Sequence, residues 1–156
     1  MNAAILSTHA TRSIPRPETH GAGEMERILV AYDGTPPARR ALETAVHMAE
    51  RFGASISVVS VVPRRPGVPV DPKQELRIHD DQLEEARRVV GARGLTAETI
   101  EPIGDPGTAI ERIARIGRFD TIVVGSRRLG AVSRLVRGSV SRHLATHAHV
   151  TVVVVP

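Results

Sequence analysis

A regular alternation of short apolar runs with segments of helical periodicity constrains this chain more than any other feature. The first run, residues 28–32, is apolar at every position, which is typical of a strand buried on both faces of a sheet. The segment after it, residues 38–52, places its apolar side chains on one face at helical spacing. This alternation predicts an α/β fold with a doubly wound, mostly parallel sheet. Such sheets bind ligands beyond the carboxyl ends of their strands.

The alternation continues after an N-terminal segment, residues 1–24, that has no apolar period. We expect that segment to be a flexible tail and residues 25–156 to form one domain, in keeping with a chain of 156 residues. The expected strands are residues 28–32, 56–62, 96–103, 121–124 and 150–155. The expected helices are residues 38–52, segments opened by Asp71-Pro72 and Asp105-Pro106, and residues 139–148. Phe52 and Leu76 are expected on the buried faces of the first two helices.

Composition excludes several classes of function. The chain has no cysteine, so disulfides, cysteine zinc sites, Fe–S clusters and thiol nucleophiles are ruled out. Aromatic residues are few, which disfavours proteins that stack nucleic-acid bases on aromatic rings. No apolar run is long enough to span a membrane, and residues 1–23 lack the pattern of a secretory signal. We therefore expect a cytoplasmic protein.

Positive charge is concentrated near the C-terminus. Residues 121–156 contain five arginines and no acidic residue, whereas the net charge of the whole chain is +4. Four of the five lie between Gly125 and Gly138. A one-sided cluster of this kind indicates an anion nearby.

Glycines at 125, 130 and 138 punctuate the same segment, and Ser139 opens the helix that follows it. Glycine lets backbone approach a ligand closely, and a helix N-terminus favours an anion. The segment lacks the Gly-Lys-Ser/Thr ending of a Walker loop. Two interpretations remain open from composition: a phosphate-binding loop, or an ordinary glycine-rich loop with Ser139 as a helix cap.

The segment Asp33-Gly34-Thr35 follows the first expected strand. Thr35 is the expected N-cap of the first helix. Asp33 can either hold the Asp-Gly turn through its side chain or contact a ligand at the strand's carboxyl end, and the second interpretation is favoured.

Taken together, four motifs make residues 25–156 resemble the universal stress protein family. The motifs are Val30-Ala-Tyr-Asp33-Gly-Thr35, Gly104-Asp105-Pro106, Asp120-Thr-Ile-Val-Val-Gly125-Ser126-Arg127 and Gly138-Ser139-Val140-Ser141. The resemblance implies a single domain with a five-stranded parallel sheet and helices on both faces, of the adenine nucleotide alpha hydrolase-like type. It also implies ATP binding, with Mg²⁺ able to follow the triphosphate, and a homodimer formed through Val150–Val155.

The resemblance further implies a set of nucleotide-binding residues. They are Ala31, Tyr32, Asp33, Ile56, Val124, Gly125, Arg127, Arg128, Gly130, Gly138, Ser139 and Val140. Ala31 and Asp33 would face the adenosine, and Ile56 would meet the adenine through its backbone. The chain departs from the family's Gly-x2-Gly-x9-Gly-Ser/Thr motif, because Arg128 stands at the middle glycine. Arg128 either closes the phosphate loop or places a guanidinium on the phosphates, or Gly130 supplies the flexibility.

Other functions receive less support from the residues. His143 and His147 share a helix face, but the Glu of the metalloprotease pattern is missing, so a helix C-terminus is favoured over a metal site. No nucleic-acid recognition motif accompanies the arginines, and no nucleophile elbow or catalytic base is visible. We expect a stress-response protein that binds ATP as a nucleotide-dependent sensor or regulator, with at most slow ATPase activity. The alternative is a dimeric interaction module that binds no nucleotide.

Overall fold

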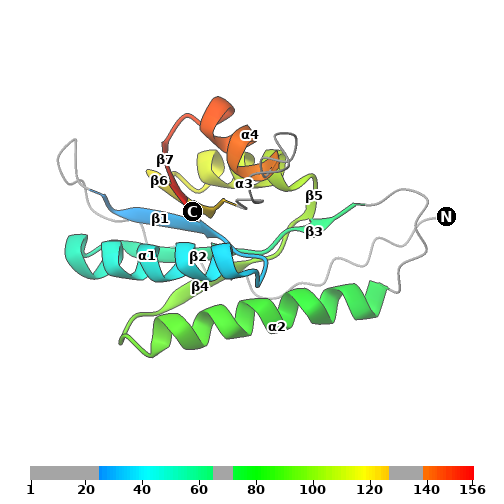
Figure 1. Cartoon of the computed structure of the whole chain (residues 1–156), viewed down its shortest axis with the longest axis horizontal. Helices are drawn as coiled ribbons and strands as arrows, with labels where there is room; N and C mark the ends of the chain where they lie inside the picture. Colours follow the sequence, from blue (N-terminus) through cyan, green and yellow to red (C-terminus); the bar gives the residue numbers. More distant parts are fainter. Residues whose placement is uncertain (1–24, 65–71, 127–138) are drawn as a thin grey trace.

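The computed structural model describes residues 25–64, 72–126 and 139–156, and the expected tail, residues 1–24, lies outside them (Figure 1). The elements are β1 (Arg27–Ala31), α1 (Pro36–Phe52), β2 (Ser55–Val59), β3 (Val62–Pro63), α2 (Pro72–Gly91), β4 (Ala97–Ile100), β5 (Ile103–Gly104), α3 (Pro106–Ile116), β6 (Thr121–Gly125), α4 (Ser139–His147) and β7 (Thr151–Val155). The five strands of the main sheet alternate with the four described helices, as predicted.

The main sheet has five strands in the order β4-β2-β1-β6-β7, and every neighbouring pair is parallel. α1 and α2 cover one face, while α3 and α4 cover the other (Figure 1). This is the predicted α/β fold with a five-stranded parallel sheet and helices on both faces. The chain builds one half of the sheet from β1 outward through β2 and β4, and the other half through β6 and β7.

The core is aliphatic, and β1 lies at its centre. Its side chains alternate between the layers: Ile28 and Val30 pack against α1 and α2, and Leu29 and Ala31 pack toward α3 and α4. Ile28, Leu29 and Val30 have no exposed surface. Full burial of such a side chain stabilises the fold by roughly 1.5–3 kcal/mol. A run that is apolar at every position is therefore typical of a strand at the centre of a parallel sheet.

The two longer expected strands are each divided in the structure. Residues 56–62 form β2 and β3, and residues 96–103 form β4 and β5, so that β3 and β5 pair in a separate two-stranded sheet. Pro102 lies at the second division. Because proline has no N–H group, it cannot continue a regular ladder of hydrogen bonds.

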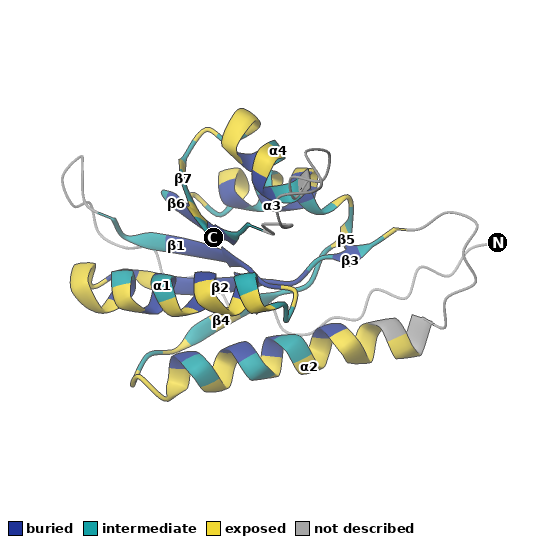
Figure 2. Cartoon of the chain, in the orientation of Figure 1, coloured by how far each residue is buried: buried dark blue, intermediate teal, exposed yellow. Residues whose placement is uncertain are grey.

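Two expected core residues are exposed. Phe52, the last residue of α1, is 62% exposed, because the buried face of this helix ends at Ala49. Leu76 is 43% exposed. It belongs to the amino-terminal turns of α2, which extend beyond β4 and are mostly exposed (Figure 2). The helical period therefore identified the face of each helix correctly but not the length over which the sheet covers it.

Candidate functional site

The candidate site lies where the chain reverses its direction of winding, between β1 and β6. These strands are neighbours in the sheet although α1, α2 and α3 separate them in the sequence. Their register pairs Ala31 with Val124 at the carboxyl ends. From these ends the chain continues to β2 on one side of β1 and to β7 on the other side of β6, and the point between two such strands is the usual ligand position in doubly wound folds. Asp33 and Gly125, predicted from separate motifs, therefore lie at the same edge.

The turn after β1 is held by the Asp33 side chain. Its Oδ1 accepts hydrogen bonds from the backbone N–H of Thr35 at 3.1 Å and from the Thr35 hydroxyl at 2.5 Å. Thr35 occupies the N-cap position of α1, as predicted, but its side chain makes no capping hydrogen bond to the helix. Asp33 is exposed and shapes the turn, so the turn-holding role weighed against ligand contact in the sequence is present in the structure.

Gly125 has a second role that the sequence did not indicate. A Cβ at this position would lie 2.5 Å from the carbonyl carbon of Pro37, 2.6 Å from its oxygen and 2.7 Å from the nitrogen of Ala38. These backbone atoms belong to the first turn of α1. The glycine therefore lets the end of β6 approach the N-terminus of that helix, whose first turn contains no acidic residue.

α4 also begins at this edge. It leads into β7, which is parallel to β6, so α4 runs back across the sheet and its N-terminus lies at the carboxyl ends of the strands. Val140, its second residue, is half-buried and packs against the same cluster as Ala31 and Val124. The helix begins at Ser139 as predicted. Arg127, Arg128, Gly130, Gly138 and the side chain of Ser139 lie outside the described part of the structure.

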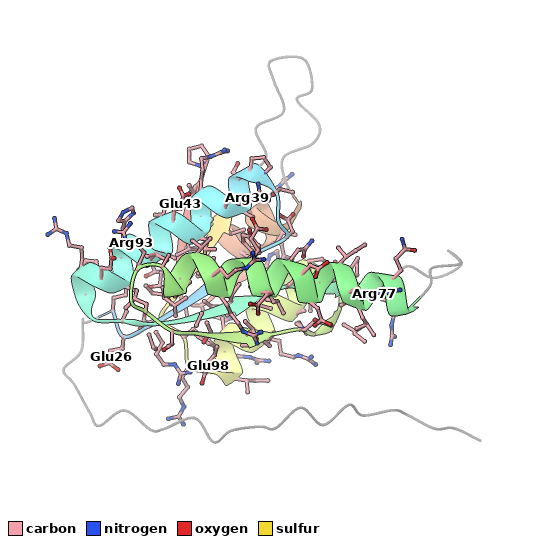
Figure 3. The ribbon with its side chains drawn as sticks, turned by 90° about the horizontal axis from the view of Figure 1, so that it is seen from below. Glu26, Arg39, Glu43, Arg77, Arg93 and Glu98 are labelled. Atoms are coloured by element: carbon pink, nitrogen blue, oxygen red, sulfur yellow. The ribbon has the colours of Figure 1, made fainter. Side chains whose placement is uncertain are left out.

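The side chain of Tyr32 points to the opposite side of the sheet from α4, into the layer formed with α1 and α2. Its side chain is 3% exposed and belongs to the cluster beneath α1 and α2. Burial raises the pKa of Tyr32, while the nearby Arg39 guanidinium lowers it and the Glu85 carboxylate raises it by smaller amounts. Arg39 reaches from α1 toward α2 and pairs with Glu85 at 2.9 Å (Figure 3). Because the side chain of Tyr32 packs beneath α1 and α2, only its backbone lies at the carboxyl edge of the sheet.

Ile56 is the sequence-predicted site residue that the structure places elsewhere. It pairs with Ile28, three positions before the Ala31–Val59 pair at the carboxyl ends. At about 3.3 Å per residue, it lies roughly 10 Å from the edge. The chain reaches the edge at Ser60 and Val61, because the expected strand 56–62 is divided at this point. Ile56 therefore lies away from the edge at which Asp33 and Gly125 meet, and its contact with the adenine stays a prediction.

A polar network beside β2 was missed in the sequence. Ser60 has no exposed surface, and its Oγ lies 2.6 Å from Nδ1 of His79. The Ser60 hydroxyl also lies 2.9 Å from Oε1 of Gln82, whose Nε2 lies 3.1 Å from the carbonyl oxygen of Asp33. The only sequence signal was a serine in an apolar run. Its partners on α2 cannot be inferred without the fold.

The histidines of α4 form a different arrangement. Nε2 of His143 lies 3.1 Å from Oε2 of Glu111 on α3, and the rings of His143 and His147 stack at 4.5 Å. Within residues 25–64, 72–126 and 139–156, no group of three or more acidic or histidine side chains could hold a metal ion.

Among the helices that the structure describes, none combines the length and the apolar character of a membrane span.

Comparisons with known proteins agree with this architecture. Residues 24–156 match the model of the universal stress protein family. The universal stress protein YxiE of Bacillus subtilis is 30% identical over 138 residues, covering 76% of this chain and 90% of that protein. Two solved structures are similar: a universal stress protein in complex with cAMP (23% identity, TM-score 0.70, 84% and 97% of the two chains) and one from Archaeoglobus fulgidus in complex with dAMP (22%, 0.68, 85% and 98%). At these identities the solved structures establish the fold.

Proposed function

Because this chain belongs to the universal stress protein family, we propose that it binds ATP at the carboxyl edge of its sheet and acts as a nucleotide-dependent sensor or regulator in a stress response. The observation that carries the proposal is the convergence at one edge of the ends of β1 and β6 with the N-termini of α1 and α4. Helix N-termini supply unpaired N–H groups and a positive dipole end, which favour phosphate. The complexes of similar proteins with cAMP and dAMP support an adenine nucleotide as the ligand.

The described residues fit such a ligand. The close approach that Gly125 permits brings the end of β6 beside the first turn of α1, and no acidic side chain occupies the first turn of α1 or α4. In this proposal Ala31 and Asp33 contact the adenosine, and Val124 and Val140 flank it. Gly125 and Gly138 with Ser139 hold the phosphates. Arg127, Arg128 and Gly130 complete the loop, and Mg²⁺ accompanies the triphosphate.

We further propose a homodimer formed through β7. β7 lies at the edge of the sheet, so one side of its backbone is not paired within the described chain. Val154 is 42% exposed, although the strand is apolar at four of its five positions. An exposed apolar edge strand is a template for pairing with another chain, and a second copy would cover it. This edge is also the observation that favours the alternative function, a dimeric interaction module without nucleotide.

The test is a calorimetric titration of Mg²⁺-ATP into the wild-type protein and into the Gly138→Asp variant. The highest ATP concentration in the titration is in the millimolar range. We expect saturable binding by the wild type and loss of binding in Gly138→Asp, because a carboxylate would repel the phosphates. Gly91→Asp is the matched control, since open space surrounds Gly91 at the far end of α2. No binding by the wild type would favour the interaction module, and unchanged binding in Gly138→Asp would refute the placement of the phosphates.

A further inference from the structure

The contacts among Ser60, His79, Gln82 and the carbonyl of Asp33 fix which group donates at each hydrogen bond. The carbonyl oxygen of Asp33 can only accept, so Gln82 must present its Nε2 amide group there. Its Oε1 then faces Ser60 and must accept, so the Ser60 hydroxyl donates to it. The remaining neighbour of Ser60 Oγ is Nδ1 of His79, which must therefore donate. The hydrogen bonds therefore run in one direction, from His79 on α2 to Ser60 just after β2, back to Gln82 on α2, and on to the turn after β1.

This network fixes the backbone of the turn after β1 from the side of α2. Gln82 bonds to the backbone of Asp33, and its Cγ lies 3.3 Å from where a Cβ of Gly34 would be. Gly34 has a φ of +73°, a left-handed conformation in which glycine is favoured. The Asp33 carboxylate is meanwhile held by Thr35. The backbone and the side chain of Asp33 are thus held separately, from α2 and from the start of α1.

The network is buried at Ser60 and His79, whereas Gln82 is half-buried and its hydrogen bond to Asp33 is exposed. Ser60 is fully buried and His79 is 9% exposed, so neither hydroxyl nor ring can exchange its partner readily for water. Residues 79 and 82 are three apart on α2, which places them on the same face of the helix. Because both the amide oxygen and the amide nitrogen of Gln82 are hydrogen-bonded, this side chain couples the position of α2 to the turn that carries Asp33.

We propose that Gln82 is a positioning residue of the nucleotide site, which orients Asp33 through its carbonyl and is itself oriented by Ser60 and His79. This inference rests on the proposed function, because it requires Asp33 to contact the nucleotide. Gln82 does not touch the ligand. It lowers the entropic cost of binding by holding the Asp33 turn in one conformation before the nucleotide arrives.

The primary experiment is a double-mutant cycle between Gln82→Met and Asp33→Ala, with the dissociation constant for Mg²⁺-ATP as the readout. Methionine keeps the length of the side chain but removes the amide. We expect Gln82→Met to weaken binding about tenfold in the wild-type background and by less than about twofold in the Asp33→Ala background. Gln74→Met, the same substitution at an exposed position of the same helix, is the control and should change affinity by less than about twofold.

His79 provides a second, independent arm. Asparagine can place an amide donor near the position of Nδ1, whereas leucine cannot. We expect His79→Leu to weaken binding several-fold and His79→Asn to restore most of the affinity, with melting temperatures recorded for every variant. This arm keeps the inference testable if Gln82→Met fails to fold.

The outcomes separate the two proposals. Wild-type protein that binds no Mg²⁺-ATP overturns the proposed function, and this inference with it. Wild-type binding together with equal losses from Gln82→Met in both backgrounds overturns the positioning role alone, because Gln82 would then act on the fold and not through Asp33. Equal affinities of His79→Leu and His79→Asn would contradict the direction of the hydrogen bonds.

Discussion

Substituting Gly125 by alanine tests whether close packing between β6 and α1 builds the site. The added methyl group would lie 2.5–2.7 Å from three backbone atoms of Pro37 and Ala38. Carbon contacts are optimal near 3.5–4.0 Å, so the end of β6 and the first turn of α1 would have to separate by about 1 Å. Backbone atoms in a helix cannot rotate out of the way as a flexible side chain can.

The expected cost follows from overpacking of a well-packed region, about 1–3 kcal/mol. For a domain of this size, 1 kcal/mol corresponds to about 2–4 °C in melting temperature, so a decrease of about 2–12 °C is expected. Affinity for Mg²⁺-ATP should fall as well. The displaced strand end carries Val124, and the displaced helix start follows directly on the turn that carries Asp33.

Thermal and urea unfolding of Gly125→Ala and Gly91→Ala provide the assay. Gly91 is in the last turn of α2 with open space around it, so alanine there should raise the free energy of unfolding by about 0.5–1 kcal/mol. The same chemical change therefore has opposite signs at the two positions. A Gly125→Ala protein as stable as the wild type would mean that α1 and β6 do not pack as closely as the structure shows.

Three further variants test other parts of the structure. Asp120→Ala should lower the free energy of unfolding by about 2–3 kcal/mol in urea, because the carboxylate accepts two 2.7 Å hydrogen bonds from the backbone at the start of β1. Hydrogen bonds from the backbone N–H and the hydroxyl of Thr108 lower the pKa of Asp105, the N-cap of α3. The stabilisation that this carboxylate gives to the fold is therefore present above the unfolded pKa and is lost on acidification. In urea titrations Asp105→Ala should cost about 1 kcal/mol at pH 7, and the difference from wild type should begin to shrink as the pH falls below about 4 and decrease further as the pH passes below the lowered folded pKa. Arg118→Gly should raise the melting temperature, since Arg118 has a φ of 51°, and relief of this strain contributes about 1 kcal/mol; an unchanged melting temperature would contradict it.

Much of the site's position could be inferred before the fold was known. Parallel strands that alternate with helices direct ligands to their carboxyl ends, so the residues after the first and fourth expected strands, Asp33 and Gly125, were candidates for ligand contact. The distance of Ile56 from this edge could not be foreseen, because a continuous apolar run does not reveal where a strand leaves the sheet. Phe52 and Leu76 show the same limit for helices, since periodicity identifies a face but not the extent of its cover.

Local patterns in the sequence were enough to predict the order of the main strands and helices and the aliphatic core, and they led us to expect a ligand at the carboxyl edge of the sheet. These properties depend on local patterns: apolar runs, helical spacing, and glycine or proline at the ends of elements. Only the tertiary structure placed β1 beside β6, brought Gly125 against α1, and joined Ser60, His79 and Gln82 to the Asp33 turn. The physical reason is that these contacts join residues distant in the chain, and their distances are set by how the layers pack, which no local pattern records.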